Sequence, residues 1–208
     1  MEIATTIDEK LFADYTRRRA KVIRDIVKKG ILEGVDWSTL KQPFGTIEII
    51  PCLMLDVQPY VHQALLSLVI THAQVTNTSS ATLPRVMTAL VESFASDLLS
   101  CFRKIPSFCM GGMLQATLEV EFLHQTLGSN VSKTAGDTLQ AVYGTIEKAY
   151  VGVGGVDLEL GKVKSLLQRS RASTKYVYAC FKSSRKGTVR EASSSASRGG
   201  SVRTRGGS

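Results

Sequence analysis

An acidic residue and a histidine three positions apart, Glu121 and His124, are the first candidates for chemistry in this sequence. On one helix such a pair shares a face, where it could bind a metal ion or transfer a proton. Di-metal helical bundles need the Glu-x-x-His motif on two helices, together with further glutamates. Neither His62 nor His72 has an acidic residue three positions earlier, so a second copy of the motif is missing. We therefore expect a solvated helix face here and no metal site.

The other catalytic motifs are incomplete. The segment GGVDLELGKV (154–163) resembles a phosphate-binding loop, but Val156 stands where the motif requires glycine and Val163 where it requires serine or threonine. The nucleophile motif G-x-S-x-G is absent. The cysteines form no C-x-x-C pair, which argues against a zinc site or a disulfide framework and favours small buried residues; they are Cys52, Cys101, Cys109 and Cys180. The sequence therefore predicts a protein that is not an enzyme and needs no cofactor.

Basic charge is concentrated toward the C-terminal end. Residues 1–150 hold 14 Lys and Arg against 15 Asp and Glu, whereas residues 151–208 hold 12 against 3. An acidic partner would therefore have to bind the C-terminal part, although an ordinary charged outer face of the last helix is the favoured interpretation. The expected contacts with an anionic surface, such as acidic lipid headgroups, are Lys162, Lys164, Arg169, Arg171, Lys175 and Lys182. No apolar run approaches the roughly 20 residues that cross a bilayer, and the N-terminus lacks a signal-peptide pattern.

Apolar residues at three- and four-residue steps predict helices along most of the chain. The predicted ranges are 7–33, 60–76, 83–104, 113–127, 133–150 and 156–184. Gly111 and Gly112 predict a turn before the fourth helix. The core stripe of that helix is expected to consist of Leu114, Leu118, Phe122 and Leu127. The run TIEII at 46–50 could form a short extended stretch, but one strand does not make a sheet.

We predict an all-α fold, an antiparallel bundle of about six helices with a disordered C-terminal tail. Residues 1–150 are expected to form the helical bundle, and residues 151–185 a basic C-terminal helix that packs on it. Residues 186–208 are rich in Ser, Gly and Arg and have too few apolar residues to order. Their Arg-Gly-Gly repeats could contact single-stranded nucleic acid, but they lack interleaved aromatic residues, so nucleic acid is the weaker candidate partner.

Four segments are specific enough to compare with a known family. They are KKGILEGVDW, LLSLVITHAQVT, LVESFASDLLSCFRKIPSFCMGGMLQATLEVEFLHQTL and KTAGDTLQAVYGTIEKAY. Together they resemble the C-terminal region of fungal exocyst complex component 2. The similarity covers roughly residues 10–185 and is densest from 83 to 150, and GGMLQATLEVEFLHQTL is its most specific piece.

The resemblance implies a subunit of the octameric complex that tethers secretory vesicles to the plasma membrane before fusion. Members of this family are rods of stacked helical bundles without catalytic residues. The implied partners are other exocyst subunits and, through them, the vesicle and the plasma membrane. The implied location is cytoplasmic, peripheral at sites of exocytosis. Members are several times longer than this chain, and their long N-terminal part has no counterpart in it.

Two other classes of function stay open on the residues alone. A protein that binds nucleic acid or an anionic membrane through its basic Arg/Gly-rich tail would show steeply salt-dependent binding. A helical metalloenzyme would retain a stoichiometric metal ion that depends on His124. Both differ from a scaffold, which would co-purify with partner proteins.

Overall fold

The computed structural model describes residues 2–40, 57–151 and 156–182, and this part of the chain is all-α, as predicted. Its α-helices are α1 (Glu2–Leu32), α2 (Pro59–Ser79), α3 (Leu83–Phe102), α4 (Met110–Leu127), α5 (Lys133–Ala149) and α6 (Val156–Ser173). Three short 3-10 helices accompany them: η1 (Ser80–Thr82), η2 (Gly128–Asn130) and η3 (Ala179–Lys182). The possible extended stretch at 46–50, Cys52 and the predicted disordered tail at 186–208 lie outside the described residues.

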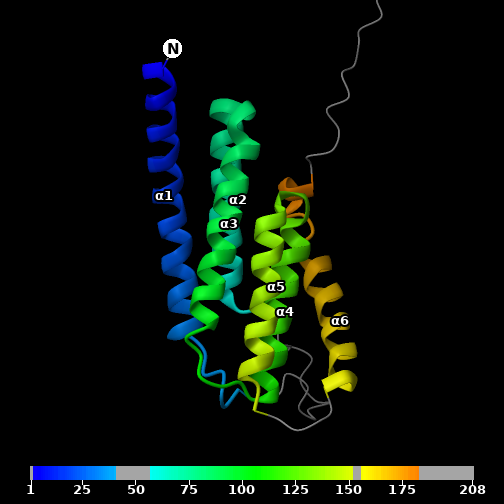
Figure 1. Cartoon of the computed structure of the whole chain (residues 1–208). Helices are drawn as coiled ribbons and strands as arrows, with labels where there is room; N and C mark the ends of the chain where they lie inside the picture. Colours follow the sequence, from blue (N-terminus) through cyan, green and yellow to red (C-terminus); the bar gives the residue numbers. More distant parts are fainter. Residues whose placement is uncertain (1, 41–56, 152–155, 183–208) are drawn as a thin grey trace, which may run out of the picture.

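Consecutive helices run antiparallel and form two rows (Figure 1). In one row α1 contacts α3 and α3 contacts α5. The other row contains α2, which contacts α1 and α3, followed by α4 and α6, which contact each other. Because α4 also packs on α5, its side chains meet neighbours on several sides. Helix α1 forms one edge of the bundle and α6 the opposite edge.

Local sequence signals explain where several helices begin and end. Pro59 opens α2, a position where its missing N–H removes no helical hydrogen bond. Ser132 caps α5, since its Oγ accepts a hydrogen bond of 3.1 Å from the Ala135 N–H. Gly128 follows α4 with a φ of +44°, a left-handed value that glycine adopts without strain.

The two glycines before the predicted fourth helix do not form a turn. They lie inside the first turn of α4, which begins three residues earlier than expected. A Cβ atom on Gly112 would come within 2.1 Å of the Trp37 carbonyl oxygen, so only glycine allows this approach. The lone Trp37 is buried, its Nε1 donates a 2.8 Å hydrogen bond to the Ile31 carbonyl, and its ring packs on Phe102.

The C-terminal helix is shorter than predicted. Instead of continuing to 184, α6 ends at Ser173. The Ser170 carbonyl accepts hydrogen bonds from the Oγ of Ser173 and from the N–H and Oγ1 of Thr174, and such local bonds favour a helix end. The chain then turns, so that Tyr178 is buried and Val177 is 49% exposed.

The turn after α6 covers the seam between α2 and α4. A hydrogen bond of 2.8 Å joins Tyr178 Oη to His62 Nδ1, and the two rings stack. The Phe181 ring is buried and meets the His72 ring edge-on. The Phe181 carbonyl accepts a 3.1 Å hydrogen bond from Ser129 Oγ, which ties η3 to η2, the short helix directly after α4. The burial of the Tyr178 and Phe181 rings therefore favours a turn where the sequence predicted that the helix would continue.

Candidate functional site

The acid and histidine of α4 do not converge on a site. His124 is exposed, whereas the Glu121 carboxylate is half-buried and turned toward α5. Its Oε2 accepts a 2.8 Å hydrogen bond from Tyr143 Oη, and its Oε1 accepts another from Gln125 Nε2. Burial, followed by the hydrogen bond to Glu121, raises the pKa of the Tyr143 phenol well above its usual value. Glu121 therefore joins α4 to α5 and is not paired with His124.

Metal-ligating side chains do not gather elsewhere in the described ranges. No group of three or more His, Cys, Asp or Glu residues there is placed to hold a metal ion. Of the cysteines in these ranges, Cys101 is buried and Cys109 and Cys180 are half-buried. The Cys109 thiol donates to the Leu40 carbonyl and accepts from the Gly112 N–H, so it serves as the cap of α4.

The predicted core stripe lies in the interior. Leu114, Leu118, Phe122 and Leu127 are each at most 2% exposed. Burial on α4 extends well beyond this stripe, because Met113, Val120 and Leu123 on other faces are also buried. A helix covered on most sides acts as the central element of the bundle rather than as one of its surfaces.

A buried carboxyl group that the sequence did not indicate lies on the same helix. Glu119 is fully buried and accepts hydrogen bonds from Tyr60 Oη of α2 at 2.5 Å and from Gln115 Nε2 at 2.8 Å. Burial raises the pKa of Glu119 to about 7, although hydrogen bonds from Gln115, Tyr60 and the Gln58 backbone oppose the rise. Its contacts are those of a buried tie between α2 and α4.

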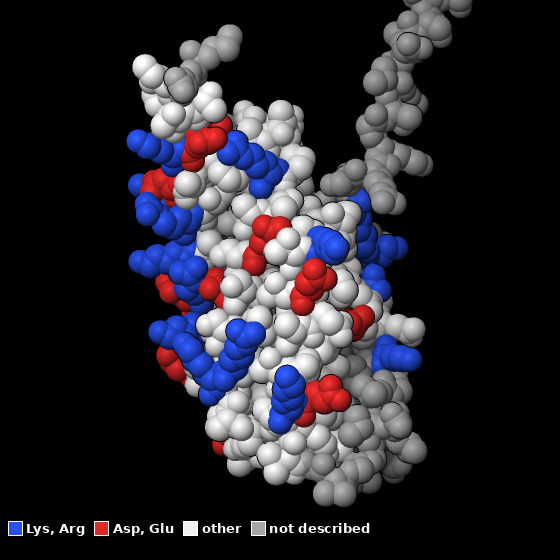
Figure 2. Space-filling model, in the orientation of Figure 1, with Lys and Arg blue, Asp and Glu red and all other residues white. Residues whose placement is uncertain are grey.

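The six basic residues predicted to contact an anionic surface do not follow one helix. Lys162, Lys164, Arg169 and Arg171 belong to α6, Lys175 lies in the turn after it, and Lys182 ends η3. The side chains of Lys164, Arg169, Arg171, Lys175 and Lys182 are exposed. Arg171 Nη1 donates a 2.6 Å hydrogen bond to Gln125 Oε1, which fastens α6 to α4. Figure 2 shows Lys and Arg gathered on the edge that α6 forms.

A second basic surface lies on α1, where the even balance of charges over residues 1–150 concealed it. Between positions 10 and 29 this helix carries eight Lys and Arg but only two acidic residues. Figure 2 shows these side chains along the α1 edge of the bundle. Counting charge helix by helix, instead of by halves of the chain, would have found this surface.

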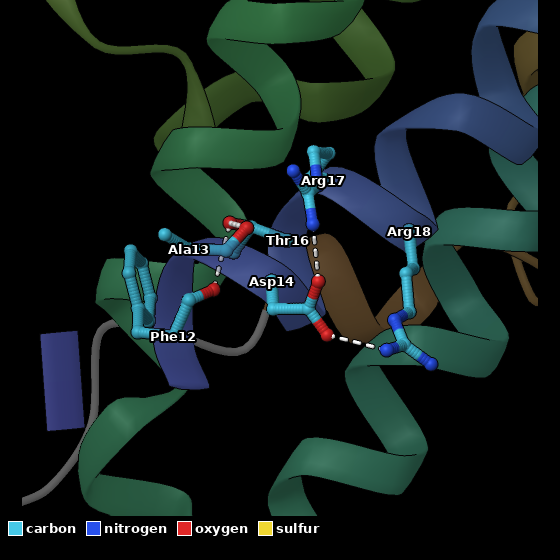
Figure 3. A network of polar contacts seen from close by, with 6 residues as sticks. All are labelled: Phe12, Ala13, Asp14, Thr16, Arg17 and Arg18. Atoms are coloured by element: carbon cyan, nitrogen blue, oxygen red, sulfur yellow. Dashed lines mark hydrogen bonds and ion pairs between the residues drawn. The ribbon is translucent and has the colours of Figure 1, made fainter. Parts of the chain in front are cut away.

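One of the two acidic residues, Asp14, is already neutralised (Figure 3). Its carboxylate forms ion pairs with Arg17 at 2.5 Å and with Arg18 at 2.7 Å. The hydrogen bonds from Arg17 and Arg18 lower the pKa of Asp14 below its usual value. The rest of the α1 surface is therefore left with a net positive charge.

Comparison with known proteins identifies the family. Residues 1–181 match the family described as exocyst complex component Sec5. Proteins described as exocyst complex component 2 from Mus musculus and Homo sapiens are 26% and 25% identical to this chain over 176 residues. These matches cover 84% of this chain but 17% of each relative, so the chain spans less than a fifth of their length. No solved structure matches.

These findings confirm the resemblance to exocyst complex component 2, while a correspondence to the C-terminal region of such proteins stays a prediction. None of the helices in the described ranges is long and apolar enough to cross a membrane. Since the family match extends over residues 1–181 of 208, the chain belongs to the Sec5 family of exocyst complex components.

Proposed function

We propose that this chain is a non-catalytic helical scaffold of the exocyst complex, and that it helps to tether secretory vesicles to the plasma membrane. The observation that carries the proposal is the Sec5 family match over residues 1–181. Its partners are then other exocyst subunits, and its contacts with the vesicle and the plasma membrane are indirect. Its place is the cytoplasmic side of the plasma membrane at sites of exocytosis.

The lengths and the packing of the described helices support a tethering role. A tether must hold two surfaces at a set distance, so its subunits need stiffness over length. At 1.5 Å per residue, the 31 residues of α1 span about 45 Å and the 21 residues of α2 about 30 Å. Each fully buried Leu or Phe contributes roughly 1.5–3 kcal/mol, and α3 and α4 each bury several of them.

Affinity capture tests the scaffold role. The full chain, tagged and expressed in cells, is purified, and the co-purifying proteins are identified by mass spectrometry. We expect exocyst subunits to be enriched at least tenfold over a capture with the unfolding variant Leu118→Asp. A folded chain that captures no exocyst subunit would contradict the proposal.

A second role, contact with an anionic membrane, is favoured by the exposed basic residues at the α6 edge. Lys and Arg close to an anionic surface contribute about 1 kcal/mol each. We expect the chain to sediment with phosphatidylserine-containing vesicles at low salt and to be released as salt rises. Replacing Lys164, Arg169 and Lys175 by Glu should abolish sedimentation, and unchanged sedimentation would refute this role. The same assay with single-stranded RNA in place of vesicles, on chains with and without residues 186–208, tests whether the C-terminal tail binds nucleic acid.

A further inference from the structure

The turn that follows α6 carries an exposed tyrosine. All six tyrosines of the chain lie in the described ranges, and Tyr176 is the exposed one among them. It is 85% exposed, more than any other large apolar or aromatic residue of these ranges, and its neighbour Val177 is 49% exposed. A tyrosine ring is apolar over most of its surface, so this ring is available for contact with a partner that offers apolar cover.

The turn is anchored at both of its ends. On the helix side, Thr174 Oγ1 donates a 2.7 Å hydrogen bond to the Ser170 carbonyl. On the other side, the Tyr178 ring is 4% exposed and stacks on the His62 ring. The three exposed residues between these anchors, 175–177, are called the tip below. Because the anchors already hold the tip in place, a partner that binds it has little chain entropy to remove.

The tip lies within a strongly basic stretch of the chain. Residues 160–190 include nine Lys and Arg and no Asp or Glu. The closest of these charges to the ring is that of Lys175, whose Nζ lies 5.8 Å from the centroid of the Tyr176 ring. Within the described ranges, none of Lys164, Lys175 and Lys182 forms an ion pair. Their charges are therefore available to an anionic partner.

The elements packed against α6 and the turn do not offset this charge. Helix α2, which the turn contacts, and η2, which η3 contacts, contain no Asp, Glu, Lys or Arg. Helix α4 carries two acidic residues, and one of them, Glu119, is fully buried. The other, Glu121, is half-buried and accepts hydrogen bonds from Tyr143 and Gln125. The field around the tip is therefore positive.

We propose that the tip is the point at which this chain inserts into an anionic membrane surface. Tyr176 and Val177 enter the layer between the headgroups and the acyl chains, where the ring is covered and its hydroxyl stays hydrated. The basic side chains around the tip lie against acidic headgroups. The inference rests on the second role proposed above, contact with an anionic membrane, and adds the residues that enter the lipid.

The shape of the tip favours a membrane over other anionic partners. A side chain that is 85% exposed protrudes, and a fluid bilayer deforms around it, whereas a folded protein has to supply a matching pocket. Single-stranded nucleic acid stacks successive bases on several aromatic side chains. The next two aromatic residues, Tyr178 and Phe181, are buried, so this part of the described chain does not offer such a row.

Fluorescence quenching by brominated lipids tests the insertion. The full chain with Tyr176→Trp is mixed with phosphatidylserine and phosphatidylcholine vesicles that carry bromine on the acyl chains. We expect a blue-shifted emission that falls about twofold relative to vesicles without bromine, because the indole enters the acyl layer. The wild-type chain, whose Trp37 is 2% exposed, gives the background. The matched control is Val22→Trp, at a position that is 51% exposed on the opposite edge of the bundle, and should not be quenched.

Vesicle sedimentation separates insertion from electrostatic attraction. Tyr176→Ser/Val177→Ser should raise the lipid concentration for half-maximal sedimentation about tenfold, by the same ratio at low and at high salt, because apolar contact is not screened. The matched control, Leu11→Ser/Val22→Ser, removes two exposed aliphatic residues from α1 and should leave sedimentation unchanged. All four positions are exposed, so we expect thermal melts of both variants to match the wild type.

The outcomes also separate the insertion from the roles proposed above. Sedimentation without quenching at position 176 would overturn the insertion, while the anionic-membrane role stands. Quenching at position 22 and not at 176 would assign the membrane contact to α1, against the proposal. Equal quenching by vesicles of phosphatidylcholine alone would show that the basic residues play no part. A chain that binds single-stranded RNA through the tip, or that binds no vesicles, would overturn both the insertion and the membrane role and leave the scaffold role standing.

Discussion

At position 119 a carboxyl group lies in the interior, held by Tyr60 and Gln115. Its pKa of about 7 lies above the ordinary value of 4.5 because burial disfavours the charged form. The folded state therefore binds the proton more tightly than the unfolded state does. The stability that Glu119 contributes is fully present below about pH 4.5 and is lost as pH rises toward 7 and above.

We expect Glu119→Gln to remove this pH dependence, since the amide does not ionise. The free energy of unfolding of the variant should match the wild type near pH 4 and exceed it by about 3 kcal/mol at pH 8. Urea unfolding at a series of pH values measures the difference. Tyr60→Phe removes one hydrogen bond that lowers the pKa of Glu119. The free energy of unfolding of this variant should therefore keep falling to a higher pH than that of the wild type. A constant difference between Glu119→Gln and wild type would show that Glu119 does not titrate in this range.

At the scale of elements, α5 depends on its cap. Ser132 Oγ accepts from the Ala135 N–H and donates a 2.6 Å hydrogen bond to Glu92 Oε1 of α3. One side chain therefore begins α5 and joins it to α3, on which α5 packs.

We expect Ser132→Ala to lower the free energy of unfolding by about 1–2 kcal/mol, because it removes a helix cap and leaves a half-buried carboxylate with one partner fewer. Thermal melts followed by circular dichroism measure the change. Thr138→Ala is the matched control, since the exposed Thr138 hydroxyl donates to the Thr134 carbonyl within the same helix and joins α5 to no other helix in the described ranges. Equal melting temperatures for the two variants would mean that the cap contributes nothing.

At the scale of the whole molecule, α3 contacts α1, α2 and α5, whereas α4 is the helix that is buried on most of its faces. Helix α4 belongs to the row that contains α2 and α6, and it also packs on α5 of the other row. Disruption of α4 should therefore unfold all the helices together rather than loosen one edge.

We expect Leu118→Asp to abolish cooperative unfolding, because it places a charge at a site that is 1% exposed. The loss of a buried Leu costs about 1.5–3 kcal/mol and the unpaired charge several more, which together approach the total stability of a typical domain. His124→Ala, at an exposed position of the same helix, should leave the melt unchanged. A cooperative melt of Leu118→Asp near the wild-type temperature would contradict the central place of α4.

Local pattern was sufficient to predict that the described chain is helical and where most helices lie. Apolar spacing depends only on residues within a few turns, and the starts of α3 and α5 match the predicted positions. The specific run around α4 was also sufficient to indicate the family, which the comparisons confirm. Neither inference required knowledge of which helix lies beside which.

The packing of distant segments decided the rest. Glu119 is polar in the sequence, yet it is buried because Tyr60 and Gln115 satisfy it. Leu11 and Val22 fit the three- and four-residue apolar spacing of α1, but they are 66% and 51% exposed because no neighbouring helix in the described ranges covers them. Residue 112 has to be glycine because a Cβ atom there would clash with the carbonyl oxygen of Trp37, which is distant in the sequence. Apolar periodicity says which side of a helix can be buried, whereas the neighbouring helices set which side is actually covered.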